Sequence, residues 1–330
     1  TRCLSDWSSD VCSSDLSNEW CLTQDLHPDD FTSYGENGGS SRLLQNRIYY
    51  YALMSGADYF SEEWGLNCSY SDMKEFSLSS YGEVKKSFIR TAETLQGVKA
   101  AIPFAIVLPK AYSCMELHDD LKNAKLGVHN DKYLDSLLSS EEKRYFGHIE
   151  DVLKLFFIRN GEVYGNEGHV ITNSRFGDVT DIIYEDGSET AMKRYDYLID
   201  ASPDGDFMQA KAGSGLKILD SSHLGKLEKE VQDLIGKVMP CQVDGLCWLV
   251  STDETGRRLL SIFNNEGNER SLEHGDIINA EADRMVTITF KESVRLNVLK
   301  ASAAATEIKQ ADALTYYVKV PAAGFVIFEF

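Results

Sequence analysis

The sequence predicts an α/β protein in three parts: an incomplete (β/α) barrel end, a flavodoxin-like doubly wound α/β domain and a C-terminal β-sandwich. Three observations lead to this prediction. A helix, a glycine stop and a short strand follow one another before Gly65, apolar strands alternate with helices after Val98, and short strands separated by turns follow Pro240. The expected boundaries are 17–97 for the barrel end, 98–239 for the α/β domain and 240–330 for the β-sandwich.

The barrel prediction depends on the stretch Tyr49–Gly65. Apolar residues recur at helical spacing over Leu43–Leu53 after the Ser40–Ser41 pair, and Gly56 stands where a helix C-cap is expected. The next residues, Ala57–Phe60, form a short strand candidate with an acidic and aromatic far end. In a barrel, the C-terminal ends of the strands carry the chemistry, so this end is the expected site.

The α/β prediction starts from Ile102–Pro109, a continuous apolar run bounded by prolines. Such a run is typical of a strand that is covered on both faces, as in a parallel sheet. Helical spacing over Gly147–Ile158 and Leu227–Val238 supplies the covering helices. Further strand or helix candidates are His169–Thr172, Asp178–Tyr184 and Tyr195–Asp200.

The β-sandwich prediction comes from six short β segments separated by turn residues. Two of the turns are Asp253–Gly256 and Asn264–Gly267. The segments are Leu246–Ser251, Arg258–Asn264, Met285–Phe290, Arg295–Leu299, Tyr316–Val320 and Phe325–Phe330.

Composition excludes several classes of partner. The 52 acidic and 33 basic residues give a net charge of -19, which argues against binding nucleic acid. No apolar run approaches the length of a membrane-spanning helix, so no membrane partner is expected. The seven cysteines show no CxxC and no zinc-ligand spacing, so neither a metal nor another cofactor is predicted. Their odd, scattered set favours a reducing compartment such as the cytoplasm, although the sequence does not fix the localisation.

Residues 1–16 are rich in Ser and Asp and have no hydrophobic period. They resemble translated sequencing-adapter sequence of the kind found at the ends of metagenomic gene calls. We therefore expect no packed structure for them, and we expect the native protein to continue upstream with the remaining barrel units.

The succession of Met54–Ala57, Glu62–Gly65 and Leu78–Glu83, then an α/β domain and a terminal β-sandwich, resembles barrel glycoside hydrolases of the beta-galactosidase kind. Those enzymes carry a trimerisation-like domain of flavodoxin-like type. The resemblance implies a carbohydrate substrate and a homo-oligomer formed through the α/β domain. It also implies two catalytic carboxylates at the ends of the fourth and seventh barrel strands, of which the first would lie upstream of Thr1.

Glycoside hydrolysis needs one protonated carboxyl group and a second carboxylate that acts as nucleophile or base. The predicted catalytic residues are Glu36 and Glu63, and the predicted substrate-binding residues are Glu62, Trp64 and Asn37. On a regular strand Glu62 and Glu63 point to opposite faces, and Glu63 shares its face with polar neighbours, so Glu63 is expected to face the sugar.

Each assignment has a structural alternative. The two carboxylates after the strand also fit a solvated strand end, Trp64 fits a core position, and Glu36 lies in a glycine-rich loop that also serves to turn the chain. A second class of function stays open: a non-catalytic oligomerisation or carbohydrate-binding module.

In the α/β domain the loop Asp200–Asp206 follows a strand and fits either a crevice lining or ordinary loop chemistry. Cys114 lacks the flanking glycines of a nucleophile elbow.

Overall fold

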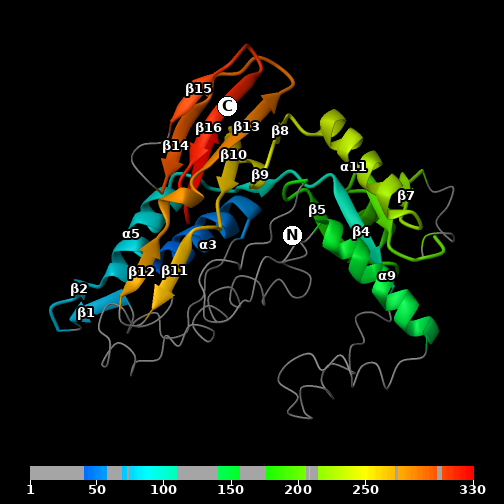
Figure 1. The fold of residues 1–330 in the computed structure, drawn as a ribbon, viewed down its shortest axis with the longest axis horizontal. Helices are drawn as coiled ribbons and strands as arrows, with labels where there is room; N and C mark the ends of the chain where they lie inside the picture. The colour runs from blue at the N-terminus through cyan, green and yellow to red at the C-terminus, as the bar shows by residue number, and fades with distance from the viewer. Residues whose placement is uncertain are drawn as a thin grey trace, which may run out of the picture. The chain divides into compact units, whose positions relative to one another are not determined.

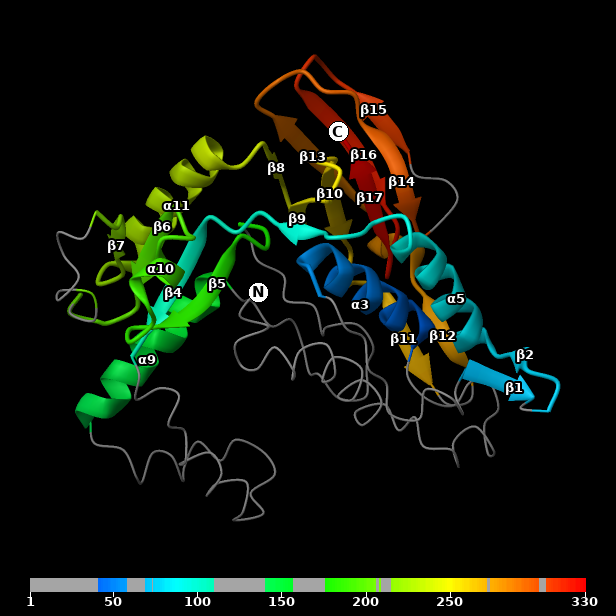
Figure 2. The ribbon, with the colours of Figure 1, turned by 180° about the vertical axis from the view of Figure 1, so that it is seen from behind.

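The computed structural model describes residues 41–57, 69–72, 74–109, 140–156, 176–205, 208, 215–271, 274–302 and 307–330. Within them the chain is a mixed α/β structure with several sheets and few helices (Figure 1, Figure 2). The described residues divide into two compact units. The first unit holds 41–101, 176–178 and 239–330, and the second holds 102–109, 140–156 and the described residues of 179–238.

The first unit is built on two antiparallel sheets and two hairpins. The five-stranded sheet has the order β14-β17-β10-β9-β3, and the four-stranded sheet has the order β15-β16-β13-β8. The strands of the first sheet are β14 (Asn297–Ala301), β17 (Phe325–Glu329), β10 (Arg258–Phe263), β9 (Cys247–Thr252) and β3 (Lys99–Ala100). Those of the second are β15 (Ile308–Gln310), β16 (Thr315–Val320), β13 (Arg284–Phe290) and β8 (Cys241–Val243). The hairpins are β1 (Tyr70–Asp72) with β2 (Ser77–Leu78), and β11 (Asn268–Ser271) with β12 (Gly275–Ile278).

Helix α3 (Arg42–Ser55) has a defined start and stop that follow from its sequence. The Ser41 hydroxyl caps the N-terminus by accepting the Leu44 N–H at 3.1 Å. At the other end Gly56 has φ +91°, its N–H bonds to the Leu53 carbonyl, and the Ala57 N–H bonds to the Ala52 carbonyl. This pair of bonds is a Schellman motif, so the predicted helix and its glycine stop are confirmed.

Three consecutive tyrosines fix α3 within the first unit. Successive residues on a helix point about 100° apart, and Tyr49, Tyr50 and Tyr51 are all buried, so α3 is covered on several sides. Tyr49 stacks on Phe88 with ring centroids 4.9 Å apart, Tyr50 packs on Phe325 at 4.6 Å, and Tyr51 meets the edge of Phe263 at 5.6 Å. These contacts join α3 to helix α5 (Ser80–Ala92), to β17 and to β10 (Figure 1).

The helices expected in a separate barrel end therefore share one core with the C-terminal sheets. Residues from α3 and α5 and from β9, β10 and β17 form a single buried cluster: Tyr49, Tyr50, Tyr51, Leu53, Met54, Phe88, Leu95, Val98, Cys247, Leu249, Leu259, Phe263, Phe325 and Ile327. The two cysteines of the described chain, Cys241 and Cys247, are buried thiols, and burial raises the pKa of Cys241 to about 12. Among the described residues, no helix is both long and apolar enough to span a membrane.

The second unit is a four-stranded parallel sheet of order β5-β4-β6-β7 with helices beside it (Figure 2). Its central strand β4 (Phe104–Leu108) is buried at all five positions, as the run between prolines predicted. The other strands are β5 (Thr180–Tyr184), β6 (Tyr197–Asp200) and β7 (Ile218–Asp220), and the helices are α9 (Ser140–Phe156), α10 (Glu189–Met192) and α11 (Leu224–Val238).

Most strands and helices expected in the described ranges are confirmed. All six strands predicted after Pro240 correspond to β9, β10, β13, β14, β16 and β17. In the same ranges the sequence prediction missed eight strands of two to four residues: β1, β2, β3, β7, β8, β11, β12 and β15. The candidate strand His169–Thr172 and most of Ala57–Phe60 lie outside the described residues.

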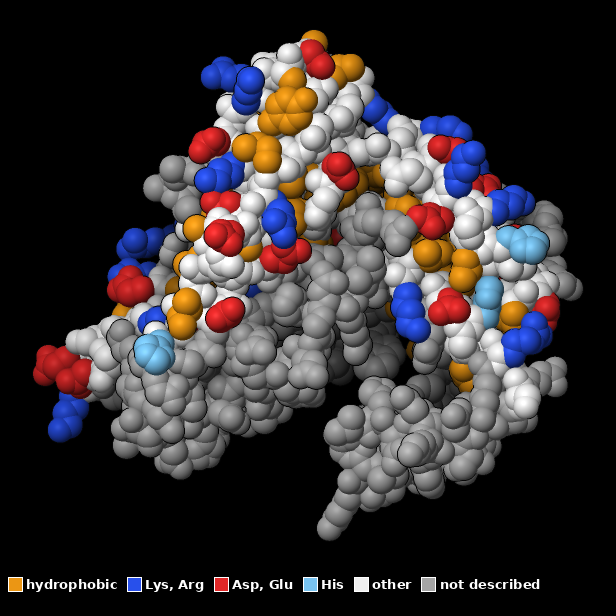
Figure 3. All heavy atoms as spheres, viewed as in Figure 1, with side chains coloured by type: hydrophobic (Ala, Val, Ile, Leu, Met, Phe, Trp, Pro, Cys, Tyr) orange, Lys and Arg blue, Asp and Glu red, His pale blue; other side chains and the backbone are white. Residues whose placement is uncertain are grey.

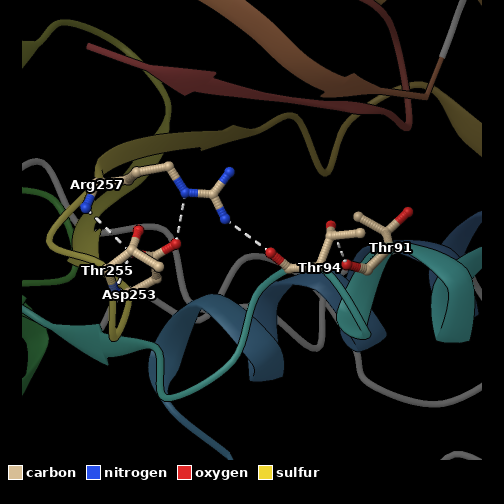
Figure 4. A network of polar contacts seen from close by, with 5 residues as sticks. All are labelled: Thr91, Thr94, Asp253, Thr255 and Arg257. Atoms are coloured by element: carbon tan, nitrogen blue, oxygen red, sulfur yellow. Dashed lines mark hydrogen bonds and ion pairs between the residues drawn. The ribbon is translucent and has the colours of Figure 1, made fainter.

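The turn between β9 and β10 is organised by one buried carboxylate (Figure 4). Asp253 accepts from the Thr255 hydroxyl at 2.7 Å and from the Arg257 Nε at 2.6 Å, and only 1% of its side chain is exposed. Arg257 in turn donates through Nη2 to the Thr94 carbonyl at 2.7 Å. Burial opposes ionisation of Asp253, but the hydrogen bonds from Thr255 and Arg257 outweigh it and lower the pKa to about 2.

Substitution of Asp253 by Asn tests this network. The Asp253 pKa is about 2 in the fold against an ordinary 3.8, so its stabilisation is complete above about pH 4 and is lost as the pH falls towards 2. We expect D253N to lower the free energy of unfolding at pH 7 by on the order of 2 kcal/mol, because the ion pair and its charge-assisted bonds are lost. Urea unfolding at pH 7 and pH 2.5 measures this. A deficit at pH 2.5 as large as that at pH 7 contradicts it.

Candidate functional site

The predicted sugar-site residues Glu36, Asn37, Glu62, Glu63 and Trp64 all lie outside the described residues. The structure therefore neither brings them together nor separates them. It does describe the helix that leads towards the strand candidate, up to Gly56 and Ala57. The catalytic and substrate-binding assignments stay predictions.

In the described part of the chain, a group of polar side chains lies at the carboxyl edge of the parallel sheet, where its strands end. In open α/β sheets, ligands bind outside the carboxyl ends of the strands. Strand β6 ends at Asp200, which is 1% exposed. Its Oδ1 accepts the Ser202 N–H at 2.9 Å and its Oδ2 accepts the Met208 N–H at 2.9 Å. Both oxygens of Asp200 thus bind the backbone of the loop that follows the strand.

A histidine from α9 reaches the same edge. The His148 Nε2 lies 3.0 Å from the Ser221 Oγ, directly after β7, and the Ser221 hydroxyl donates to the Ser202 carbonyl at 3.2 Å. Because the Ser221 hydroxyl proton is directed at that carbonyl, the imidazole Nε2–H is the donor to Ser221. One turn earlier on α9, Arg144 forms an ion pair with Asp204 at 3.2 Å. The helix is therefore tied to both the β6 and the β7 loops.

Burial favours the neutral form of His148. Burial lowers the pKa of His148 below its ordinary 6.5; Arg144 adds to this effect, and the carboxylates of Asp151, Asp204 and Asp220 oppose it. Asp220 is itself held ionised: hydrogen bonds from the Ser222 backbone and hydroxyl, both 2.8 Å long, lower its pKa.

The chemistry of this edge is positioning rather than attack. A nucleophilic hydroxyl must reach its substrate, and Ser221 and Ser202 have no exposed surface. Asp200, the buried carboxylate of the group, has both oxygens bonded to loop N–H groups. Among the residues that the structure describes, no three His, Cys, Asp or Glu side chains are grouped as a metal site would require. The sequence suggested the loop Asp200–Asp206 as a crevice lining. As far as this loop is described, Asp200 holds it in place through hydrogen bonds to the loop N–H groups.

Sequence reasoning missed the link between His148 and Ser221. The two residues are 73 positions apart, and only the parallel pairing of β6 with β7 and the placing of α9 bring them together. The one local signal is that a Ser follows closely after the Asp that ends a strand: Ser202 after Asp200 of β6, and Ser221 after Asp220 of β7. That repeat of Asp and Ser after two neighbouring strands is the pattern that points to this edge.

Comparison with known proteins gives distant likenesses only. No family model matches the chain, and no curated protein matches it. An alpha-L-fucosidase, isoenzyme 2 from Paenibacillus thiaminolyticus, is similar with a TM-score of 0.40 and 10% identity over 88% of this chain and 58% of the fucosidase. The catalytic module of a family 98 glycoside hydrolase from Streptococcus pneumoniae TIGR4 is similar with a TM-score of 0.29 and 10% identity over 87% of this chain and 56% of that module.

Both of these structures bear the names of glycoside hydrolases. Their TM-scores lie below 0.5, so the likenesses carry no argument about what this chain does. The chain spans 58% and 56% of the lengths of the two proteins.

Substitution of His148 by Gln tests the role of the edge as an anchor. Because the folded His148 has a lowered pKa, the unfolded chain binds the proton more readily, and stability is lost as the pH falls through 6.5. The glutamine amide of H148Q retains a donor for Ser221 but does not titrate. We therefore expect the unfolding midpoint of the wild type to fall more between pH 8 and pH 5 than that of H148Q.

The exposed His223 of the same unit supplies the matched control, H223Q. It should retain the wild-type pH dependence. An H148Q midpoint that falls with pH as steeply as that of H223Q rules out the imidazole as the source.

Proposed function

We propose that this chain is the C-terminal part of a glycoside hydrolase, and that its described residues form the frame on which a sugar site is assembled. The first support is the sequence resemblance to beta-galactosidase-like barrel enzymes over Met54–Ala57, Glu62–Gly65 and Leu78–Glu83. The substrate is a carbohydrate, and the retained chemistry is hydrolysis of an O-glycosyl bond.

The observation that carries the proposal is the burial of α3 against the C-terminal sheets. A free-standing binding module needs no apolar helix from a preceding domain in its core. Here Tyr50, Met54 and their neighbours on α3 are fully buried in one cluster with β9, β10 and β17. Such a core holds the C-terminal end of α3, as far as Ala57, on the five-stranded sheet, and a site assembled after this helix needs a fixed support of this kind.

The finer architecture is part of the proposal. The parallel sheet has the order β5-β4-β6-β7, and counting its strands along the chain gives 2-1-3-4, the order that begins a flavodoxin-like sheet. The two antiparallel sheets, whose strands other than β3 all lie in residues 239–330, favour a β-sandwich. We propose the α/β unit as the surface through which copies of the protein associate, by analogy with the trimerisation-like domain of the resembling enzymes.

The catalytic assignment is likewise proposed. Glu36 and Glu63 are the candidates for the carboxylate that this chain supplies, with Glu62, Trp64 and Asn37 as sugar contacts, and the second carboxylate of the pair is supplied by the upstream barrel. Without those barrel units the chain lacks most of the barrel strands. We therefore expect the chain alone to hydrolyse no aryl-galactoside at a useful rate.

The decisive experiment recovers the upstream gene and assays the whole protein. In that protein E63Q should lower turnover of an aryl-galactoside by a hundredfold or more, since a general acid, base or nucleophile is lost. E62Q makes the same change one residue away on the other strand face, at a proposed sugar contact, and should lower turnover or sugar affinity much less than E63Q does. Equal losses, or a larger loss for E62Q, would mean that the face assignment is wrong.

The alternative function, a non-catalytic carbohydrate-binding or oligomerisation module, predicts a different result. Under that alternative the chain binds sugars without any upstream segment, and neither E36Q nor E63Q changes turnover of the whole protein. Turnover by the 330-residue chain alone, abolished by E36Q or E63Q, would instead show that the upstream units are dispensable.

A further inference from the structure

A hollow of about 360 Å³ opens on the surface of the first unit, between α5 and β14. Ligand pockets for small molecules begin at about 300 Å³, so this volume suits one compact molecule such as a monosaccharide. The lining residues of the hollow are Glu83, Lys86, Ser87, Arg90, Thr91 and Thr94 from α5 and its C-terminal end, and Leu299 and Lys300 from β14.

Helix α5 presents two faces of opposite character. Tyr81 and Phe88 are buried in the core of the unit. Glu83, Lys86, Arg90 and Thr94 follow one another at steps of three or four residues, and Ser87 lies four residues after Glu83, which places them along one side of the helix and its C-terminal end. The apolar face holds the helix on the core, and the polar side is free to line the hollow.

Strand β14 contributes two neighbouring residues because it is irregular. Consecutive residues of a regular strand point to opposite faces. In β14 the pairing with β17 shifts between Val298, opposite Phe328, and Lys300, opposite Ile327. Leu299 is the extra residue of this bulge, and both Leu299 and Lys300 line the hollow. Bulges of this kind redirect side chains next to binding sites.

Lys300 is held at the wall by two contacts. Its Nζ donates to the Ser87 hydroxyl at 3.1 Å and lies 5.7 Å from the centre of the Tyr50 ring. Tyr50 is one of the three tyrosines that fix α3, so the ammonium is positioned by the rigid core of the unit. The ammonium has three N–H donors, of which the Ser87 contact uses one.

The charge of the hollow is positive in a chain of net charge -19. The face drawn in Figure 3 carries basic and acidic side chains interspersed. Lys86, Arg90 and Lys300 face a single carboxylate, Glu83, which lies 3.3 Å from Lys86. In the described part of the chain the exposed Arg90 guanidinium has no acidic partner.

The threonine hydroxyls are already engaged. Thr91 donates to the Ser87 carbonyl at 3.2 Å and accepts from the Tyr50 hydroxyl, and Thr94 donates to the Thr91 carbonyl at 2.7 Å. The groups left to bind a ligand are therefore cationic donors, with Leu299 as an apolar wall. Guanidinium and ammonium groups together select an oxyanion.

We propose that this hollow binds an oxyanion-bearing ligand of about monosaccharide size, with Arg90 and Lys300 on the carboxylate or sulfate group and Leu299 against the body of the ligand. The lining includes none of the proposed catalytic residues, and the proposal does not depend on the upstream barrel. A sugar acid and a free inorganic anion share this chemistry, and the test distinguishes them.

Calorimetric titration of the 330-residue chain with glucuronic acid, glucose and sodium sulfate tests the proposal. We expect glucuronic acid to bind saturably, more weakly as salt is raised, and glucose not to bind. R90Q should weaken binding by about tenfold or more, and K300M should also weaken it, since each removes one charged donor. E83Q should strengthen binding, because it removes the carboxylate that repels the anion.

R194Q is the matched control for R90Q, because it changes the net charge equally at an exposed arginine of the second unit. Unchanged binding by R194Q together with weakened binding by R90Q assigns the effect to the hollow. Sulfate that binds as tightly as glucuronic acid and competes with it supports the site and assigns a free anion as its ligand. Binding of glucose equal to that of glucuronic acid, or wild-type binding by both R90Q and K300M, overturns the proposal.

Discussion

The packing of α3 on the C-terminal sheets is the interaction on which the rest of the first unit depends. Three adjacent tyrosines point in three directions, and each finds an aromatic partner on a different element, α5, β17 or β10. Tyrosine suits this place because the ring packs in the core while the hydroxyl keeps a hydrogen bond. Tyr49 accepts from Gln45, Tyr50 donates to Thr91, and Tyr51 donates to Asp178. The helix is therefore fixed in position and rotation, and not only buried.

This arrangement also explains what was predictable from the sequence. All five residues of β4 are apolar, four of the six residues of β10 are apolar, and the cap of α3 is local chemistry at Ser41 and Gly56, so these elements follow from neighbouring residues. Strands such as β7 and β15 have three residues, too few for a hydrophobic period to show. That α3 shares a core with strands some two hundred residues later is a tertiary fact, and no local pattern encodes it.

The candidate polar sites also combine features that the sequence predicts with features that it does not. A carboxylate after a strand was readable from the sequence at Asp200, but its two bonds to loop N–H groups were not. The same holds for Asp253, whose lowered pKa comes from a turn that it closes itself. A perturbed pKa such as that of Asp253 does not by itself mark a functional site, because ion pairs and hydrogen bonds that hold the chain together also shift pKa values. Of the residues that the structure describes, these two acidic groups serve the backbone. The predicted sugar-site residues, Glu36 and Glu63 among them, lie outside the described ranges and stay untested by geometry.

The hollow between α5 and β14 depends on the same core, because Tyr50 of that core supports its wall. Tyr50 packs its ring on Phe325, donates its hydroxyl to Thr91 and lies beneath the Lys300 ammonium. The buried Tyr50 side chain thus fixes α3, donates a hydrogen bond to the Thr91 hydroxyl and orients the Lys300 ammonium at the wall of the hollow. Because the Tyr50 ring is buried in the core, folding already orders the Lys300 side chain, and a ligand does not have to order it on binding. A surface lysine without such support loses rotamer freedom when it binds an anion, which is why isolated surface charges bind weakly. The bulge at Leu299 and the buried Tyr50 together make this patch a preorganised one, and neither feature is visible in the sequence around Lys300 alone.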